Sequence, residues 1–288
     1  MADVYAKIGE LDSAALEQLA HVLELRAMDH QQQQMREDYF ANISFPPNAR
    51  VLEVGCGTGV VARALAARPE VAEVIGLDPS PALLSKAQSL SAGIGNLRFV
   101  QGEASALKFS EHAFDVVVFH TALCHIPHPQ AALSEAFRVL QPGGSLAIFD
   151  ANYADTTLAT STVDPLQSCA QAAVNNIALD PWLVPRLRAL VEKVGYRVLR
   201  FQSYIYDGIQ PPDYMLTIVD RGADALHKEG RVGAELAIAL KSEARRRVQS
   251  GEFFGQISYA SLIAAKPADA ARRSNAEACN GGGQEYAQ

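Results

Sequence analysis

The sequence has few cysteines, no excess of positive charge and no long hydrophobic run. Its four cysteines, Cys56, Cys124, Cys169 and Cys279, share no short spacing, so neither a CxxC redox centre nor a zinc site is indicated. The formal net charge is −7 and the pI about 5.5, which disfavours nucleic acid as a partner because that affinity comes largely from Lys and Arg on phosphates. No charged-then-apolar leader opens the chain, and no apolar run could span a bilayer. These absences favour a cytoplasmic protein without a membrane partner, and they leave a homodimer open.

The 288 residues do contain a regular alternation of strand and helix patterns. Apolar strand patterns fall at about 50–54, 74–77, 97–100, 114–119 and 145–150, and helical patterns lie between them at about 59–67, 80–91 and 129–139. Such alternation predicts an α/β fold with a parallel sheet and helices on both faces.

The two ends of the chain depart from this alternation. A helix is expected over 12–40, with Asp12 and Ser13 able to cap its start. The second half predicts a helix over 181–194, a strand over 196–206, helices at about 212–228 and 231–249, and a strand over 253–265. The run Arg245–Arg247 is read as a solvated helix face rather than a phosphate site.

The glycine-rich turn after the strand at 50–54 is the most informative stretch. Gly55, Gly57 and Gly59 would let a ligand touch the backbone, because no Cβ stands in the way. A dinucleotide fingerprint would place its third glycine where this sequence has Val60. Glu53 lies inside the strand, where an acid suits a ligand carrying an amine better than a pyrophosphate.

The run Glu53–Gly59 resembles the first motif of class I S-adenosylmethionine (SAM) dependent methyltransferases. Three more stretches are similar to the family's motifs, in order: a strand that ends in Asp78, the strand Phe114–Val118 followed by His120–His125, and the turn Leu140–Gly144. The resemblance is best over 50–150 and closest to the small-molecule branch, methyltransferase type 11, that includes quinone-biosynthesis enzymes. It implies SAM as cofactor, S-adenosylhomocysteine as product and a small-molecule acceptor.

The resemblance also implies a domain organisation. We expect a Rossmann-like, doubly wound sheet of seven strands, parallel apart from one antiparallel strand. An N-terminal helical segment would cover 1–48, and the SAM-binding domain 49–206 and 252–266. Residues 207–251 would form a helical insert that caps the substrate side, since they separate two strands that usually form a hairpin. The Gly-rich tail, 267–288, is predicted to be disordered.

Each family motif assigns particular residues to the cofactor. Glu53 would hold the methionine end of SAM, Asp78 would accept hydrogen bonds from both ribose hydroxyls, and Glu103 would receive the adenine amino group. The complete set of expected cofactor-binding residues is Glu53, Gly55, Cys56, Gly57, Thr58, Gly59, Asp78, Pro79, Gly102, Glu103, Ala104, His120 and Thr121.

Histidines near the end of the fourth strand are the candidate acid–base groups. His125 matches a histidine that small-molecule members carry beside the methyl site, so we expect it to act as a base or as an orienting group. His120 is expected to line the cofactor pocket and His128 to lie in a turn. Their spacing fits no helix face, which disfavours a metal site. Tyrosines could line the acceptor pocket: Tyr39, Tyr153, Tyr204, Tyr206 and Tyr214.

The predicted activity is transfer of a methyl group to an O, N or C nucleophile of a small apolar or aromatic molecule by in-line substitution. The enzyme's main contribution would be to position the reactants and exclude water. Two alternatives remain at this point: a regulatory SAM-binding module without chemistry, and a nicotinamide-dependent oxidoreductase.

Overall fold

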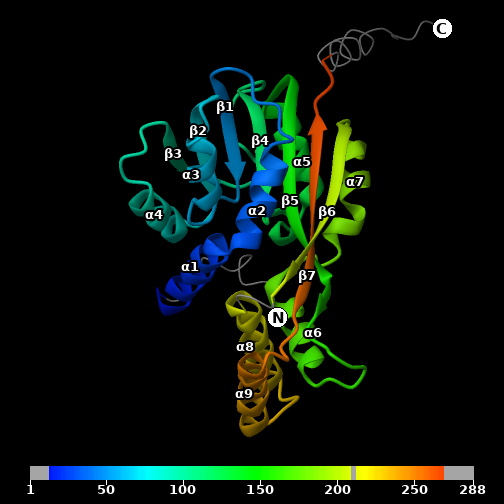
Figure 1. Ribbon diagram of the computed structural model, residues 1–288. Helices are drawn as coiled ribbons and strands as arrows, with labels where there is room; N and C mark the ends of the chain where they lie inside the picture. The colour runs from blue at the N-terminus through cyan, green and yellow to red at the C-terminus, as the bar shows by residue number, and fades with distance from the viewer. Residues whose placement is uncertain (1–12, 209–211, 269–288) are drawn as a thin grey trace, which may run out of the picture.

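Seven strands form one mixed sheet in the order β3-β2-β1-β4-β5-β7-β6 (Figure 1). The computed structural model describes residues 13–208 and 212–268. Strands β1 to β5 pair in parallel, and β7 runs antiparallel to both β5 and β6. The Rossmann-like sheet with a single antiparallel strand is therefore confirmed. The strands are β1 (Ala49–Val54), β2 (Val71–Asp78), β3 (Leu97–Gln101), β4 (Phe114–His120), β5 (Leu140–Thr157), β6 (Arg197–Asp207) and β7 (Gln256–Ala265).

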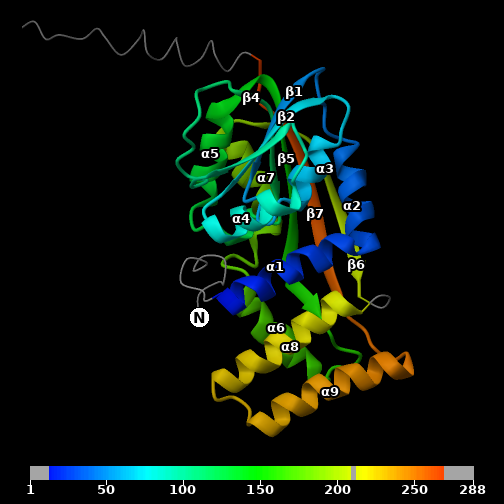
Figure 2. The ribbon, with the colours of Figure 1, turned by 90° about the vertical axis from the view of Figure 1, so that its left-hand side faces the viewer.

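Helices cover both faces of the sheet, with α2 and α3 on one side and α5 and α7 on the other (Figure 2). The central strand β4 is buried from Val116 to Phe119, which explains its continuous apolar run. Among the described residues, no helix combines the length and the apolar character needed to cross a bilayer. The helices are α1 (Ser13–Met28), α2 (His30–Phe40), α3 (Val60–Ala66), α4 (Pro81–Leu90), α5 (Pro129–Val139), α6 (Leu166–Ile177), α7 (Leu183–Val194), α8 (Asp213–Lys228) and α9 (Ala234–Ser250), with a 3-10 turn at Leu123–His125.

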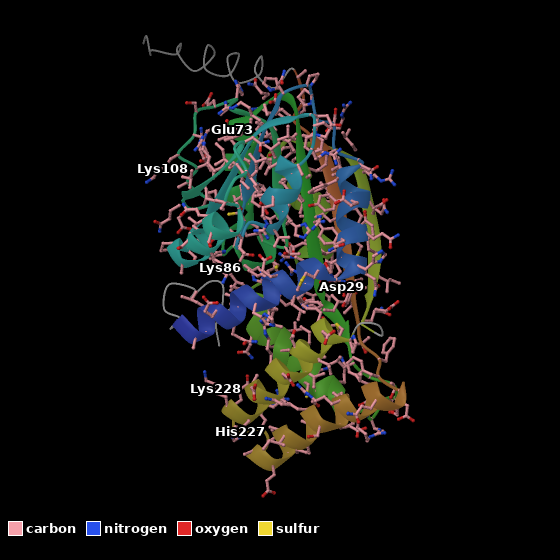
Figure 3. All side chains as sticks on the ribbon, turned by 60° about the vertical axis from the view of Figure 1, so that its left-hand side comes forward. Asp29, Glu73, Lys86, Lys108, His227 and Lys228 are labelled. Carbon is pink, nitrogen blue, oxygen red and sulfur yellow. The ribbon has the colours of Figure 1, made fainter. Side chains whose placement is uncertain are left out.

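The expected continuous helix over 12–40 is wrong, because the chain breaks at Asp29 into α1 and α2 (Figure 3). Asp29 has an extended backbone, and its side chain caps α2 by accepting a hydrogen bond from the backbone N–H of Gln32 at 3.1 Å. The other carboxylate oxygen accepts a bond from the Tyr206 hydroxyl at 2.8 Å. The break turns α1 across the carboxyl ends of the strands. The expected capping residue Asp12 lies outside the described residues.

Beyond the carboxyl ends of the strands, α6, α8 and α9 form a separate helical layer (Figures 1 and 2). Helix α6 was not predicted from the sequence, and β5 extends to Thr157, beyond the expected end at about 150. A Cβ at Gly222 of α8 would stand 2.0 Å from the carbonyl oxygen of Cys169, so α6 and α8 cross with almost no space between their backbones. The predicted insert 207–251 thus shares its layer with α6, and the domain boundaries stay a prediction.

Each guanidinium of the Arg245–Arg247 run is paired with a carboxylate. Arg245 bonds Asp220, and Arg246 bonds Glu243 and Glu252. Arg247 bonds both oxygens of the buried Asp164 at 2.6 and 3.1 Å, which ties α9 to the loop before α6. The run therefore joins parts of the helical layer.

Candidate active site

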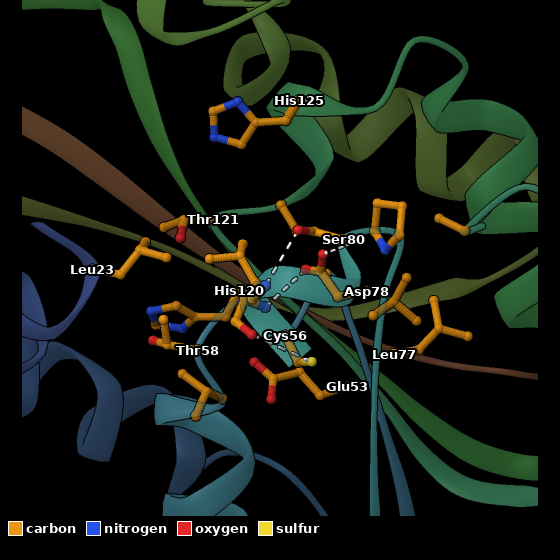
Figure 4. Close-up of a pocket in the computed structure, with 18 of the residues that line it drawn as sticks. Leu23, Glu53, Cys56, Thr58, Leu77, Asp78, Ser80, His120, Thr121 and His125 are labelled. Carbon is orange, nitrogen blue, oxygen red and sulfur yellow. Dashed lines mark hydrogen bonds between the residues drawn. The ribbon is translucent and has the colours of Figure 1, made fainter. Parts of the chain in front are cut away.

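A cavity of about 500 Å³ opens at the carboxyl ends of β1, β2 and β4 (Figure 4). Chain order reverses between β1 and β4, the position where open α/β sheets bind their ligands. Helices α1 and α2 close the other side of the cavity with Leu23, Arg26, Gln32 and Arg36. The volume is in the range that holds a small organic ligand, about 300–1,000 Å³.

The glycine-rich turn forms one wall of the cavity. Gly55 and Gly57 have left-handed backbones, with φ of 76° and 53°, and a Cβ at Gly55 would meet the Cβ of Ala122 at 2.6 Å. The N–H of Gly57 donates to Asp78 at 2.8 Å, which ties the turn to the end of β2. Gly59 and Gly102 do not line the cavity, because they face Phe99 and Leu77 instead.

Two buried carboxylates lie under this turn. The Oε2 atom of Glu53 has no hydrogen-bond partner, and burial together with the charge of Asp78 raises the pKa of Glu53 to about 8. Asp78 accepts bonds from the backbone N–H groups of Gly57 and Ser80, and burial raises its pKa as well. The nearby Arg63 is bonded to Glu24 on α1. A ligand with positive charge and N–H donors would compensate this pair of acids.

Ser80, and not Asp78, caps the N-terminus of α4, the helix that follows β2. The Ser80 hydroxyl accepts from the N–H of Leu83 at 3.3 Å, and Pro81 occupies the first turn of α4. Each Asp78 oxygen bonds a single backbone N–H, so both keep a free lone pair for further donors. The geometry is compatible with the predicted ribose role.

His120 is held as a neutral imidazole. Its Nδ1 lies 2.9 Å from the Tyr39 hydroxyl, and its ring stacks on Phe149 with centroids 4.9 Å apart. Burial, followed by the charges of Arg26 and Arg36, lowers the pKa of His120 well below its usual value. The next residue, Thr121, accepts a hydrogen bond from Arg26 at 2.7 Å. Both predicted residues therefore line the cavity where α1 crosses it.

His125 lines the cavity on the side away from Glu53 (Figure 4). The fully buried Asp150 in β5 accepts hydrogen bonds from the N–H groups of Cys124 and Ala151. Burial raises the pKa of Asp150, and the charge of His125 acts on it in the opposite direction. The charge of His125, the candidate base, therefore interacts with the buried carboxyl group of Asp150. His128 also lines the cavity, and the described residues contain no grouping of three or more possible metal ligands.

The remaining predicted cofactor residues, Cys56, Thr58, Pro79, Glu103 and Ala104, also line the cavity. Sequence reasoning missed the contribution of the first two helices, namely Arg26, Gln32 and Arg36, and it missed Asp150. Basic and amide side chains on a helical pattern look like an ordinary solvated face. The break between α1 and α2 at Asp29 brings Arg26, Gln32 and Arg36 to the cavity at the carboxyl ends of the strands.

The fold and the cavity define a Rossmann-like protein with a candidate ligand site at the carboxyl ends of its strands. A family described as a methyltransferase domain, type 11, matches residues 52–148. The chain is 28% identical over 218 residues to a 2-phytyl-1,4-naphtoquinone methyltransferase of Thermosynechococcus vestitus, covering 74% of this chain and 88% of that protein. It is 28% identical to a 2-methyl-6-phytyl-1,4-hydroquinone methyltransferase of Synechocystis, covering 58% of this chain and 60% of that relative.

A solved structure with the same fold is that of a Bacillus halodurans protein assigned as a methyltransferase. It superposes with a TM-score of 0.59 at 21% identity, over 81% of this chain and 98% of that one. The likeness to this structure shows the fold. The family match and the two quinone-methyltransferase relatives support a class I SAM-dependent methyltransferase, an enzyme whose cofactor is SAM.

The residues present fit that cofactor. The buried Oε2 of Glu53 and the buried Oγ1 of Thr58 have no hydrogen-bond partner among the described residues, and both residues line the cavity. Close approach of Ala122 to Gly55 and of Leu23 to Gly57 leaves no room for larger side chains in the turn. Glu53 would hold the amine of the methionine end, and Asp78 the ribose.

Proposed function

We propose that the protein transfers a methyl group from SAM to an O, N or C nucleophile of a small apolar or aromatic molecule. The observation that carries this proposal is the pair of buried acids, Glu53 and Asp78, which form no ion pair with any residue that the structure describes. A ligand without a cationic group would leave the negative charge of Glu53 and Asp78 uncompensated. The quinone substrates in the names of the two cyanobacterial relatives support an aromatic acceptor.

Bound SAM supplies an electrophilic methyl on a sulfonium sulfur, which is open to in-line substitution. The chain's own residues would position the nucleophile and exclude water. Helix α1 covers the cavity through Leu23 and Arg26, so it separates the reacting atoms from solvent. His125 is proposed to accept the proton of an acceptor that arrives protonated. Residues 207–251 are proposed as a cap, since Tyr214 and Ile218 of α8 face α1 across a second, small cavity.

The experiment has two parts. Calorimetric titration should show binding of S-adenosylhomocysteine and none of NAD. Incubation with methyl-labelled SAM and 1,4-naphthohydroquinone should then label the naphthalene compound. Binding of NAD with no response to S-adenosylhomocysteine would contradict the proposal. Cofactor binding without labelling of any hydroxyl-bearing, amine-bearing or carbon acid acceptor would favour a regulatory module instead.

A further inference from the structure

The arginines that line the cavity are Arg26 on α1 and Arg36 on α2. Arg26 donates a hydrogen bond to the hydroxyl of Thr121 at 2.7 Å. Arg36 donates from Nε and Nη2 to one carboxylate oxygen of Glu37, at 3.4 Å in both cases. These two bonds are long, and the Glu37 side chain is 60% exposed, so Glu37 compensates the charge of Arg36 only weakly.

The guanidinium of Arg36 is shielded from solvent on a helix that is tied to the sheet. Its side chain is only 16% exposed, and charged side chains are seldom buried to this extent unless they are paired. Asp38, two positions further along α2, accepts hydrogen bonds from Gln202 and Tyr204 of β6 at 2.7 and 2.8 Å. A shielded cation at the wall of a cavity would be stabilised by an anionic group of the ligand.

Tyr39 relates the position of Arg36 to that of Glu53. Its ring is fully buried and stacks on Phe149 with centroids 5.2 Å apart, and its hydroxyl lies 2.9 Å from Nδ1 of His120. Burial raises the pKa of Tyr39 well above its usual value, and the charges of Glu53 and Arg36 act on this pKa in opposite directions. An acid and a cation are therefore both close to this one fixed side chain, and both line the same cavity.

The methionine end of SAM carries its amine and its carboxylate on the same carbon atom. If Glu53 holds the amine, the carboxylate must lie close to Glu53 and Asp78, whose negative charges repel it. A carboxylate in that position needs a cation nearby. A guanidinium suits this task because its fork of N–H groups can bond both carboxylate oxygens in parallel.

We propose that Arg36 binds the carboxylate of the methionine end of SAM. This inference rests on the proposed function and adds a residue to its cofactor site. The amine, the ribose and the adenine have expected partners in Glu53, Asp78 and Glu103, and Arg36 supplies the partner of the remaining charged group. With the amine at Glu53 and the carboxylate at Arg36, the methionine end is held at two points, which fixes the direction of the chain that carries the sulfonium.

Calorimetric titration of the full chain with two ligands tests this inference. The ligands are S-adenosylhomocysteine and its decarboxylated analogue, which keeps the amine and lacks the carboxylate. The wild type should bind the analogue about tenfold or more weakly, the usual effect of losing a hydrogen bond between charged groups. Arg36→Gln should weaken S-adenosylhomocysteine binding by a similar factor and leave the affinity for the analogue unchanged.

Arg98→Gln is the matched control, because Arg98 of β3 also bonds a single glutamate, Glu73, at 3.0 Å and does not line the cavity. It should leave the affinity for both ligands unchanged. Arg36→Lys keeps the positive charge but loses the paired donors, so it should bind S-adenosylhomocysteine with an affinity between those of the wild type and Arg36→Gln. This second variant keeps the test available if Arg36→Gln does not fold.

Equal affinity of the wild type for the two ligands, or an Arg36→Gln variant that keeps the full preference for S-adenosylhomocysteine, would overturn the assignment of Arg36. Arg36 could instead hold an anionic acceptor, for which 1-hydroxy-2-naphthoate is the probe. Arg36→Gln would then weaken binding of this probe to the chain saturated with S-adenosylhomocysteine and leave S-adenosylhomocysteine affinity unchanged, which also overturns the assignment. Failure of the wild type to bind S-adenosylhomocysteine would overturn the proposed function itself.

Discussion

The buried carboxyl of Glu53 predicts that cofactor binding releases a proton. Its pKa is raised to about 8 in the protein without ligand, so at pH 7 most molecules carry a proton on Glu53. The amine of a cofactor bound beside Oε2 favours the ionised carboxylate, so the proton must leave Glu53 when the cofactor binds. Titration of S-adenosylhomocysteine at pH 7 in buffers of different ionisation enthalpy should therefore show release of close to one proton.

The same group predicts how the stability of the unliganded protein depends on pH. The folded-state pKa is above its ordinary value of 4.5, so the folded protein holds this proton more tightly than the unfolded chain does. The free energy of unfolding should fall as the pH rises from about 4.5 to 8, by at most about 4–5 kcal/mol at 1.4 kcal/mol per pH unit. Asp78 contributes in the same direction, because burial raises its pKa too.

Glu53→Gln removes the titrating group and keeps its size. The variant should bind S-adenosylhomocysteine more weakly, release no proton on binding, and lose less stability than the wild type between pH 5 and 8. Denaturant unfolding at several pH values measures the change in stability. Proton release that persists in Glu53→Gln, or an unchanged pH dependence of stability, would show that another group is responsible.

Three further changes test other parts of the site and the fold. Asp78→Ala should weaken S-adenosylhomocysteine binding tenfold or more by calorimetry, through loss of one or two charge-assisted hydrogen bonds; an unchanged dissociation constant would leave Asp78 a brace for the glycine turn. His125→Ala should lower turnover roughly a hundredfold, with little change in SAM affinity; a variant that keeps its rate would make His125 a pocket wall. Gly222→Ala should lower the free energy of unfolding by about 1–3 kcal/mol or more, because its Cβ would meet a backbone carbonyl. Gly233→Ala, at a position with open space and a negative φ, should lower it far less. Equal losses in the two variants would refute the close crossing of α6 and α8.

The sheet and the cofactor half of the site could be predicted because their signals are local. A continuous apolar run marks β4, and apolar residues predominate in β1; most positions of both strands are buried. Positive φ values at Gly55, Gly57 and Gly59 require the residue type that the sequence supplies. The strand ending in Asp78 places an acid at the edge where the cavity opens. Each of these features depends on residues that are close in sequence.

The unpredicted features depend on contacts between distant residues. The break at Asp29 is fixed by Tyr206, which is 177 positions further along the chain. Helix α6 buries mainly small side chains, Ala170, Ala172 and Ala173 among them, so it lacks a stripe of large apolar residues. Its partner is Gly222 of α8. Only the folded chain brings these elements together, and with them Tyr153 and Tyr214, which line the second, small cavity.

The charges in the cavity explain why His120 must stay neutral. The acids Glu53 and Asp78 lie on one side, and Arg26 and Arg36 close the other, so a ligand with a cationic and an anionic end has one preferred direction. A charged imidazole between them would repel a cationic ligand. Burial and the two arginines lower the pKa of His120, and Tyr39 can donate its hydroxyl hydrogen to Nδ1, which leaves the ring hydrogen on Nε2. The first two helices therefore do more than cover the cavity, because the charges of their two arginines add to the effect of burial in lowering the pKa of His120 on β4.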